Sequence, residues 1–175
     1  WEGDMKKLII AVTALALAAC TPPPSETGAE DVVLGIYNSV TENIGQRVTP
    51  LSEIPMTDDL SDLVTRAQAA ADARGEPFIE GDIAANCQDC TSIGDLVIGA
   101  QTGPEPVPAP SGHRMVEARF TLNGTEPRAV LYDMVETPEG WRVDNILAEG
   151  FSLRTEAQAY LEDTNDALEP TPPPP

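Results

Sequence analysis

The sequence has few of the residues that usually build catalytic sites. It contains one histidine and three cysteines among 175 residues, and 5% of its residues are aromatic. It has no Gly-x-Ser-x-Gly, no His-Glu-x-x-His and no glycine-rich phosphate loop. These absences argue against a serine hydrolase, a zinc protease and a nucleotide-dependent enzyme. We therefore expect a protein that is not an enzyme and uses no cofactor.

Basic residues are also scarce. The chain has 10 lysines and arginines against 29 aspartates and glutamates, which gives a net charge of −19. Nucleic acids and anionic lipid surfaces should repel such a chain, so we expect no nucleic-acid partner. The acidic residues are spread along the sequence. They indicate a well-solvated surface, with a specific cationic partner as the alternative.

The main apolar run is too short to cross a membrane as a helix, which takes about 20 residues. This run, Leu8–Ala19, follows the basic pair Lys6-Lys7 and ends in Leu17-Ala18-Ala19-Cys20. A basic start, a short apolar segment and small residues at its end are typical of an export signal. The pattern resembles the bacterial lipoprotein signal, which is cut before a cysteine that then receives a diacylglycerol and an acyl chain. We expect residues 1–19 to be removed and Cys20 to be lipidated, with an ordinary cleaved signal as the alternative.

Lipid on Cys20 would fix the protein to a membrane of the bacterial cell envelope, facing the periplasm. In proteins of this type an aspartate after the cysteine often keeps the protein in the inner membrane. Here that residue is Thr21, which favours the outer membrane over the inner one. Trp1–Asp4 precede Met5, which we take as the start of translation.

Two proline-rich segments flank a single predicted domain. Residues 20–28 predict an extended tether, and residues 169–175 predict a disordered tail. Proline has no N–H group, so these segments cannot continue a helix or join a central strand. The remaining residues 29–168 are enough for one folded domain with a modest core.

The first part of this domain has helical periodicity. In residues 31–44 apolar side chains recur at spacings of three and four, which places them on one face of a helix. A second helix is predicted from the capping residue Thr57 to Arg74, where Gly75 ends it.

The second part of the domain alternates apolar and polar residues, as strands do. Asn123-Gly124 predicts a tight hairpin, because both residues tolerate positive φ. A last helix follows, capped by Ser152. Helices followed by antiparallel strands indicate an α+β domain with helices packed on one face of a sheet. The predicted strands cover residues 96–100, 116–122, 129–136 and 141–147.

Several short motifs resemble an uncharacterised family of bacterial envelope lipoproteins with an NTF2-like, cystatin-like fold. The resemblance implies two N-terminal helices packed in the concave face of a curved, four-stranded antiparallel sheet, followed by a C-terminal helix. It carries no activity, because the family is itself of unknown function. This chain departs from the family pattern at the cysteines that flank Gln88-Asp89, and at Asn145, where the family often has an acidic residue. The motifs are Pro50-Leu51, Leu60-x-x-Leu63, Pro77-Phe78-Ile79, Gln88-Asp89, Trp141–Ile146 and Ser152-Leu153-Arg154.

The segment Cys87-Gln88-Asp89-Cys90 has the spacing of redox and zinc motifs. A structural zinc site needs about four ligands, and only His113 is available beyond these two thiols, so we expect no metal. The segment is predicted to be a loop rather than a strand that opens a helix, which argues against a thioredoxin-like site. We expect a small structural disulfide, with a labile, redox-sensing disulfide as the alternative.

Asp144 is the strongest candidate for a carboxylate in a pocket, because strand alternation lets it face the concave side of the sheet. We expect it to be paired, with Arg119, Arg128 or Arg154 as candidate partners. NTF2-like enzymes typically place an aspartate and a histidine inside the cone. His113 follows Gly112 at the end of a proline-rich loop, and it is expected to be solvated.

The sequence therefore predicts a lipid-anchored module that binds a protein or envelope material, with Gln88, Asp89 and the loop 102–112 as candidate surfaces. The alternative is a small-molecule-binding or enzymatic pocket, with Asp144 and Asp89 near its mouth.

Overall fold

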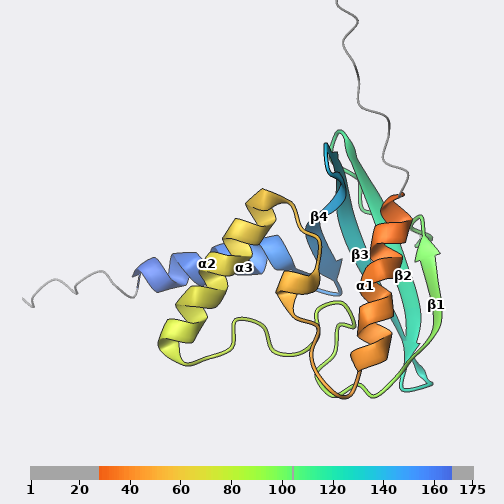
Figure 1. Cartoon of the computed structure of the whole chain (residues 1–175), viewed down its shortest axis with the longest axis horizontal. Coiled ribbons are helices and arrows are strands. Elements are labelled where there is room, and N and C mark those ends of the chain that lie inside the picture. The colour runs from red at the N-terminus through yellow and green to blue at the C-terminus, as the bar shows by residue number, and fades with distance from the viewer. Residues whose placement is uncertain (1–27, 104, 167–175) are drawn as a thin grey trace, which may run out of the picture.

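The computed structural model describes residues 28–103 and 105–166, with side chains described up to residue 163. Within these residues the chain is an α+β domain, as expected (Figure 1). The predicted signal, Cys20, most of the tether and the proline tail lie outside the described residues. The elements are α1 (Ala29–Asn43), a short 3-10 helix (Leu51–Glu53), α2 (Asp58–Arg74), β1 (Ile93–Gly99), β2 (His113–Leu122), β3 (Glu126–Thr137), β4 (Gly140–Ala148), β5 (Phe151–Ser152) and α3 (Leu153–Asp166).

The sheet is open and antiparallel, with its five described strands in the order of the sequence. The hairpin between β2 and β3 turns at Asn123 and Gly124, which have φ values of 50° and 77°. Two successive residues at positive φ match the right-handed twist of the strands that they join. The predicted Asn-Gly hairpin is confirmed.

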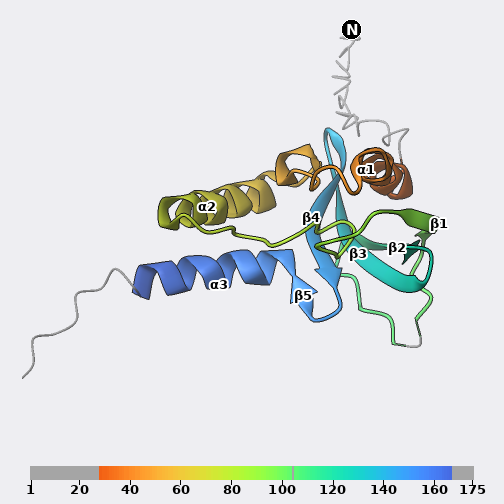
Figure 2. The ribbon, with the colours of Figure 1, turned by 90° about the horizontal axis from the view of Figure 1, so that it is seen from below.

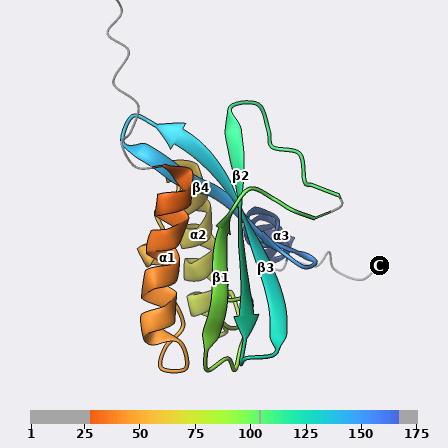
Figure 3. The same cartoon turned by 90° about the vertical axis from the view of Figure 1, so that its right-hand side faces the viewer.

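Helix α1 lies along one face of the sheet (Figure 3). Its face of buried apolar residues packs on the sheet, as the spacing in the sequence predicts, and α1 lies closest to β1, β2 and β4. Tyr37 is at the centre of this layer, with its ring centroid 5.4 Å from that of Phe120 and 6.2 Å from that of Tyr132. The largest fully buried side chains are Tyr37, Tyr132, Leu60, Leu122, Met134, Ile146, Leu153, Val33, Val40, Val116, Val130 and Val143.

Helix α2 is not packed on the sheet beside α1, and in this respect the predicted arrangement is wrong. It projects from the β4 side of the sheet and packs along α3 (Figures 1 and 2). The residues just before it explain this path, because Met56 forms a parallel bridge with Val143 and fixes the start of α2 beside β4. Its buried stripe includes the small residues Ala67 and Ala71, which suit close contact with another helix.

The predicted limits of α2 and the predicted start of α3 are confirmed. Thr57 caps α2 by accepting a hydrogen bond from the Leu60 N–H, and Gly75 ends the helix at a φ of 72°. Ser152 lies at the start of α3 and accepts a hydrogen bond from the Thr155 N–H. None of the helices in the described part of the chain is long and apolar enough to cross a membrane.

Strand β4 contains a bulge that the simple alternation of its sequence does not reveal. Asp133 on β3 lies opposite Asn145, and Met134 lies opposite Val143, so Asp144 has no residue opposite it. Val143 and Ile146 are both buried although they are three residues apart. Simple alternation would place Val143 on one face of the strand and Asp144 and Ile146 on the other, and this pattern is wrong because the bulge interrupts it.

Two buried tyrosines on the same core layer differ in one hydrogen bond. The Tyr37 hydroxyl donates to the Ala84 carbonyl at 2.6 Å, whereas the Tyr132 hydroxyl has no partner among the described residues. Burial raises the pKa of both hydroxyls, so both stay protonated at neutral pH. A buried hydroxyl without a partner lowers stability, because folding removes it from water without replacing the lost hydrogen bond.

We expect Tyr37→Phe to lower the free energy of unfolding by about 1–2 kcal/mol, because the Ala84 carbonyl then loses a buried donor. Tyr132→Phe is the matched control, and its stability should equal or exceed that of the wild type. Urea unfolding followed by circular dichroism measures both. An equal loss in the two variants would mean that the Tyr132 hydroxyl also has a hydrogen-bond partner in solution.

Candidate functional site

The segment between α2 and β1 folds around the carboxylate of Asp82. One oxygen of Asp82 accepts hydrogen bonds from the N–H groups of Ala84 and Ala85, and the other accepts from Thr49 at 2.8 Å. Asp82 is 8% exposed. Three N–H donors satisfy this buried charge. The same carboxylate joins the segment to the chain that follows α1.

Backbone contacts close this segment into a tight loop. The Asp82 N–H donates to the Cys87 carbonyl at 2.7 Å, and the reverse bond measures 3.2 Å. Gly81 packs directly on this bridge, since a Cβ atom there would lie 2.4 Å from the Cys87 oxygen. Gly81 also has a φ of 97°, which an L side chain rarely adopts. This position therefore requires glycine.

The predicted disulfide joins Cys87 to Cys90 at the end of this loop. Beyond it, the N–H and hydroxyl of Thr91 both donate to the side chain of Asn123 in the β2–β3 hairpin. The loop is thus held at both of its ends, by Asp82 and by Thr91. Gln88 and Asp89 are displayed between these two points.

An open groove of about 380 Å³ separates this loop from the chain that follows α1. Gln88 and Asp89, the candidate binding residues from the sequence, line one wall of this groove. Val48 lines the other wall and is 50% exposed. Arg47 also lines the groove and forms an ion pair of 3.1 Å with Glu53. The complete lining is Ile44, Gly45, Gln46, Arg47, Val48, Asp82, Gln88, Asp89, Cys90 and Thr91.

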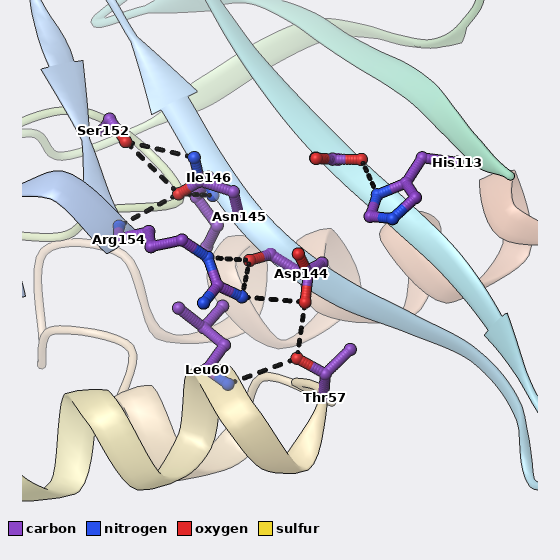
Figure 4. Close-up of polar contacts among 9 residues, drawn as sticks. Thr57, Leu60, His113, Asp144, Asn145, Ile146, Ser152 and Arg154 are labelled. Atoms are coloured by element: carbon purple, nitrogen blue, oxygen red, sulfur yellow. Dashed lines mark hydrogen bonds and ion pairs between the residues drawn. The ribbon is translucent and has the colours of Figure 1, made fainter. Parts of the chain in front are cut away.

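Asp144 occupies different surroundings, at the bulge of β4 (Figure 4). One of its oxygens accepts hydrogen bonds from the Thr57 hydroxyl and from Arg154, both at 2.8 Å. Of the three arginines considered from the sequence, Arg154 is the partner, while Arg119 pairs with Glu117 and Arg128 pairs with Glu126. These contacts join the first residues of α2 and α3 to the sheet and give Asp144 a structural role.

His113 is not simply solvated, in contrast to the expectation from the sequence. It begins β2, and its Nδ1 lies 2.8 Å from a carboxylate oxygen of Asp133 on β3 (Figure 4). The two side chains are 21% and 11% exposed. Sequence reasoning missed Asp133, although an aspartate inside the apolar run Val130–Val135 is a signal that its side chain has a specific partner.

Comparisons with known proteins do not assign a family. No family profile matches this sequence, and no curated protein is similar to it. A solved structure that resembles the chain is the phospholipid-binding protein from Ralstonia solanacearum in complex with a phospholipid. It is 17% identical, with a TM-score of 0.33 over 78% of this chain and 74% of that chain. A likeness this weak carries no information on the ligand of this chain, and membership of the lipoprotein family stays a prediction.

The carboxylates of Asp82 and Asp89 should respond differently to neutralisation. We expect Asp82→Asn to lower the free energy of unfolding by about 2 kcal/mol, because bonds between N–H groups and a charged acceptor contribute roughly that much. Asp89→Asn should change stability by less than about 0.5 kcal/mol, since an exposed side chain without a described bond has little to lose. Thermal and urea unfolding of both variants measure the difference. Equal stabilities for the two variants would contradict the role assigned to Asp82.

Proposed function

We propose that this chain is a non-enzymatic binding module of the bacterial cell envelope, anchored through lipid on Cys20, and that its groove binds a partner protein. The observation that carries the proposal is the construction of the groove. Its two walls come from distant parts of the sequence, and Asp82 ties one directly to the other. A wall fixed in this way presents Gln88 and Asp89 in one arrangement, so binding would lose little conformational entropy.

The chemistry of the groove favours a polypeptide. Val48 offers exposed apolar surface on one wall, while Gln88 and Asp89 offer polar groups on the other. Arg47 is the cation of the groove, and Glu53 pairs with it, so a strongly anionic ligand finds little charge to bind. A partner segment with apolar and basic side chains would complement both walls.

The alternative of a pocket with Asp144 and Asp89 at one mouth receives less support. Asp89 lines the groove beside the disulfide, whereas Asp144 binds Thr57 and Arg154 at the start of two helices. The pairing of His113 with Asp133 does provide the histidine that an acid–base site would need.

Anchoring is tested by metabolic labelling with an alkyne analogue of palmitate in bacteria that produce the full chain. We expect label on the wild-type protein and none on Cys20→Ser, because lipid attachment needs the thiol of residue 20. The wild type should sediment with membranes, while the variant should move to the soluble fraction. Cys90→Ser is the control for a general effect of removing a cysteine, and it should keep the label. Label on Cys20→Ser would refute the anchor.

Partner binding is tested with a photo-crosslinking amino acid at position 88 or 48 in living cells. We expect both positions to yield one protein adduct of the same mass. The same amino acid in place of Arg66, on the exposed face of α2, should yield no adduct. Asp89→Arg should abolish the adduct from position 48, whereas Asp62→Arg, on α2, should leave it unchanged. The same adducts from position 66 and from the groove would contradict the proposal.

A further inference from the structure

Three adjacent strands bring metal-ligating side chains together away from the groove. His113 comes from the start of β2, Asp133 from the middle of β3 and Asp144 from the bulge of β4. Each of the three offers one ligand atom, and these atoms all lie within 4.8 Å of one another. Since His113 and Asp133 are 20 positions apart and Asp144 follows 11 positions later, only the pairing of the strands makes them neighbours.

We propose that His113, Asp133 and Asp144 bind one divalent metal ion of the zinc type. Zinc bonds to imidazole nitrogen and carboxylate oxygen are about 2.0–2.2 Å long, so the ligand atoms of a tetrahedral site lie about 3.4 Å apart. The three atoms now lie within 4.8 Å of one another, so side-chain rotations would have to bring them to this separation. An imidazole with two carboxylates favours zinc over magnesium or calcium, which prefer oxygen ligands alone.

The surroundings of Asp144 leave it able to coordinate an ion. Thr57 and Arg154 both bind the same oxygen, Oδ1. The second oxygen has no described bond to either residue and points away from Thr57 in Figure 4. Bonds of this kind from a second layer of residues orient a ligating carboxylate.

Asp133 supplies the electrostatic reason for a cation. Its carboxylate is 11% exposed, and its one described side-chain partner is His113. A carboxylate removed from water needs a positive partner or several donors. In the described part of the chain, seven of the eight arginines pair with carboxylates other than this one. A metal ion between His113 and Asp133 would supply that charge.

The site would remain open on one side. His113 and Asp144 are 21% and 23% exposed at their side chains, so solvent reaches both residues. Three protein ligands and a water molecule are the arrangement of zinc sites with an exchangeable position. The proposed site is independent of the groove and of the disulfide, and it involves no cysteine.

The single histidine of the chain gives a direct test. The full chain is prepared without a histidine tag, treated with a chelator and titrated with zinc chloride. Correlation spectra of the imidazole ring, from ¹⁵N-labelled protein, then contain signals from His113 alone. We expect one equivalent of zinc to shift one ring nitrogen strongly, whereas magnesium chloride at the same concentration should not. Unchanged ring signals at saturating zinc would overturn the proposal and leave only the hydrogen bond between His113 and Asp133.

Isothermal titration calorimetry of variants tests the two carboxylates. Asp133→Asn and Asp144→Asn should each weaken zinc binding at least about tenfold. Replacing a residue that only hydrogen-bonds to a metal ligand already lowers metal affinity by about that factor, and these two residues are proposed to be ligands themselves. Glu136→Gln is the control, because Glu136 is an exposed carboxylate on the same strand as Asp133. His113→Gln keeps a hydrogen-bonding side chain beside Asp133 and should also lose the zinc. Wild-type affinity in all three ligand variants would show that zinc binds elsewhere, for example at a thiol.

Discussion

The packing of Tyr37 is the contact on which most of the domain depends. Its ring lies between α1 and the sheet, close to the rings of Phe120 and Tyr132. Its hydroxyl donates a hydrogen bond to the carbonyl of Ala84, in the loop that forms one wall of the groove. One fully buried side chain therefore joins the helix, the sheet and the loop. The shape of the groove is thus coupled to the integrity of the core.

The bulge at Asp144 is the second constraint, and it organises the other end of the molecule. An extra residue in β4 lets Val143 and Ile146 both stay in the core, while Asp144 and Asn145 take polar partners. Asn145 accepts hydrogen bonds from the N–H groups of Ile146 and Arg154, and so fixes the start of α3. Bulges often redirect side chains near functional sites, and this one brings Asp144 beside His113 and Asp133.

The charge of the domain follows from how few cations it has. Most of the described arginines pair locally with glutamates or aspartates, and such surface pairs contribute little to stability. The excess carboxylates therefore set the electrostatic potential of the surface. A strongly negative potential raises the local concentration of cationic ligands, which include both basic peptides and divalent ions. The proposed groove and the proposed metal site are each compatible with that potential.

The sequence by itself determined the local structure. Helix α1, the limits of α2 at Thr57 and Gly75, the Asn123-Gly124 turn and the Cys87–Cys90 disulfide all depend on residues close together in the chain. Periodicity, caps and turn residues act over a few positions, so they can be read directly. The pairing of Asp144 with Arg154 was also within reach, because only ten positions separate them.

Only the tertiary structure decided where α2 lies, which residues β4 turns inward and what surrounds His113. Each of these depends on contacts between distant segments: Met56 with Val143, the shifted register of β3 and β4, and His113 with Asp133. Register is not encoded in the alternation of one strand, since a single extra residue reverses the facing of every side chain beyond it. Local sequence therefore indicates most of the elements, and the packing of their side chains decides which chemical groups meet.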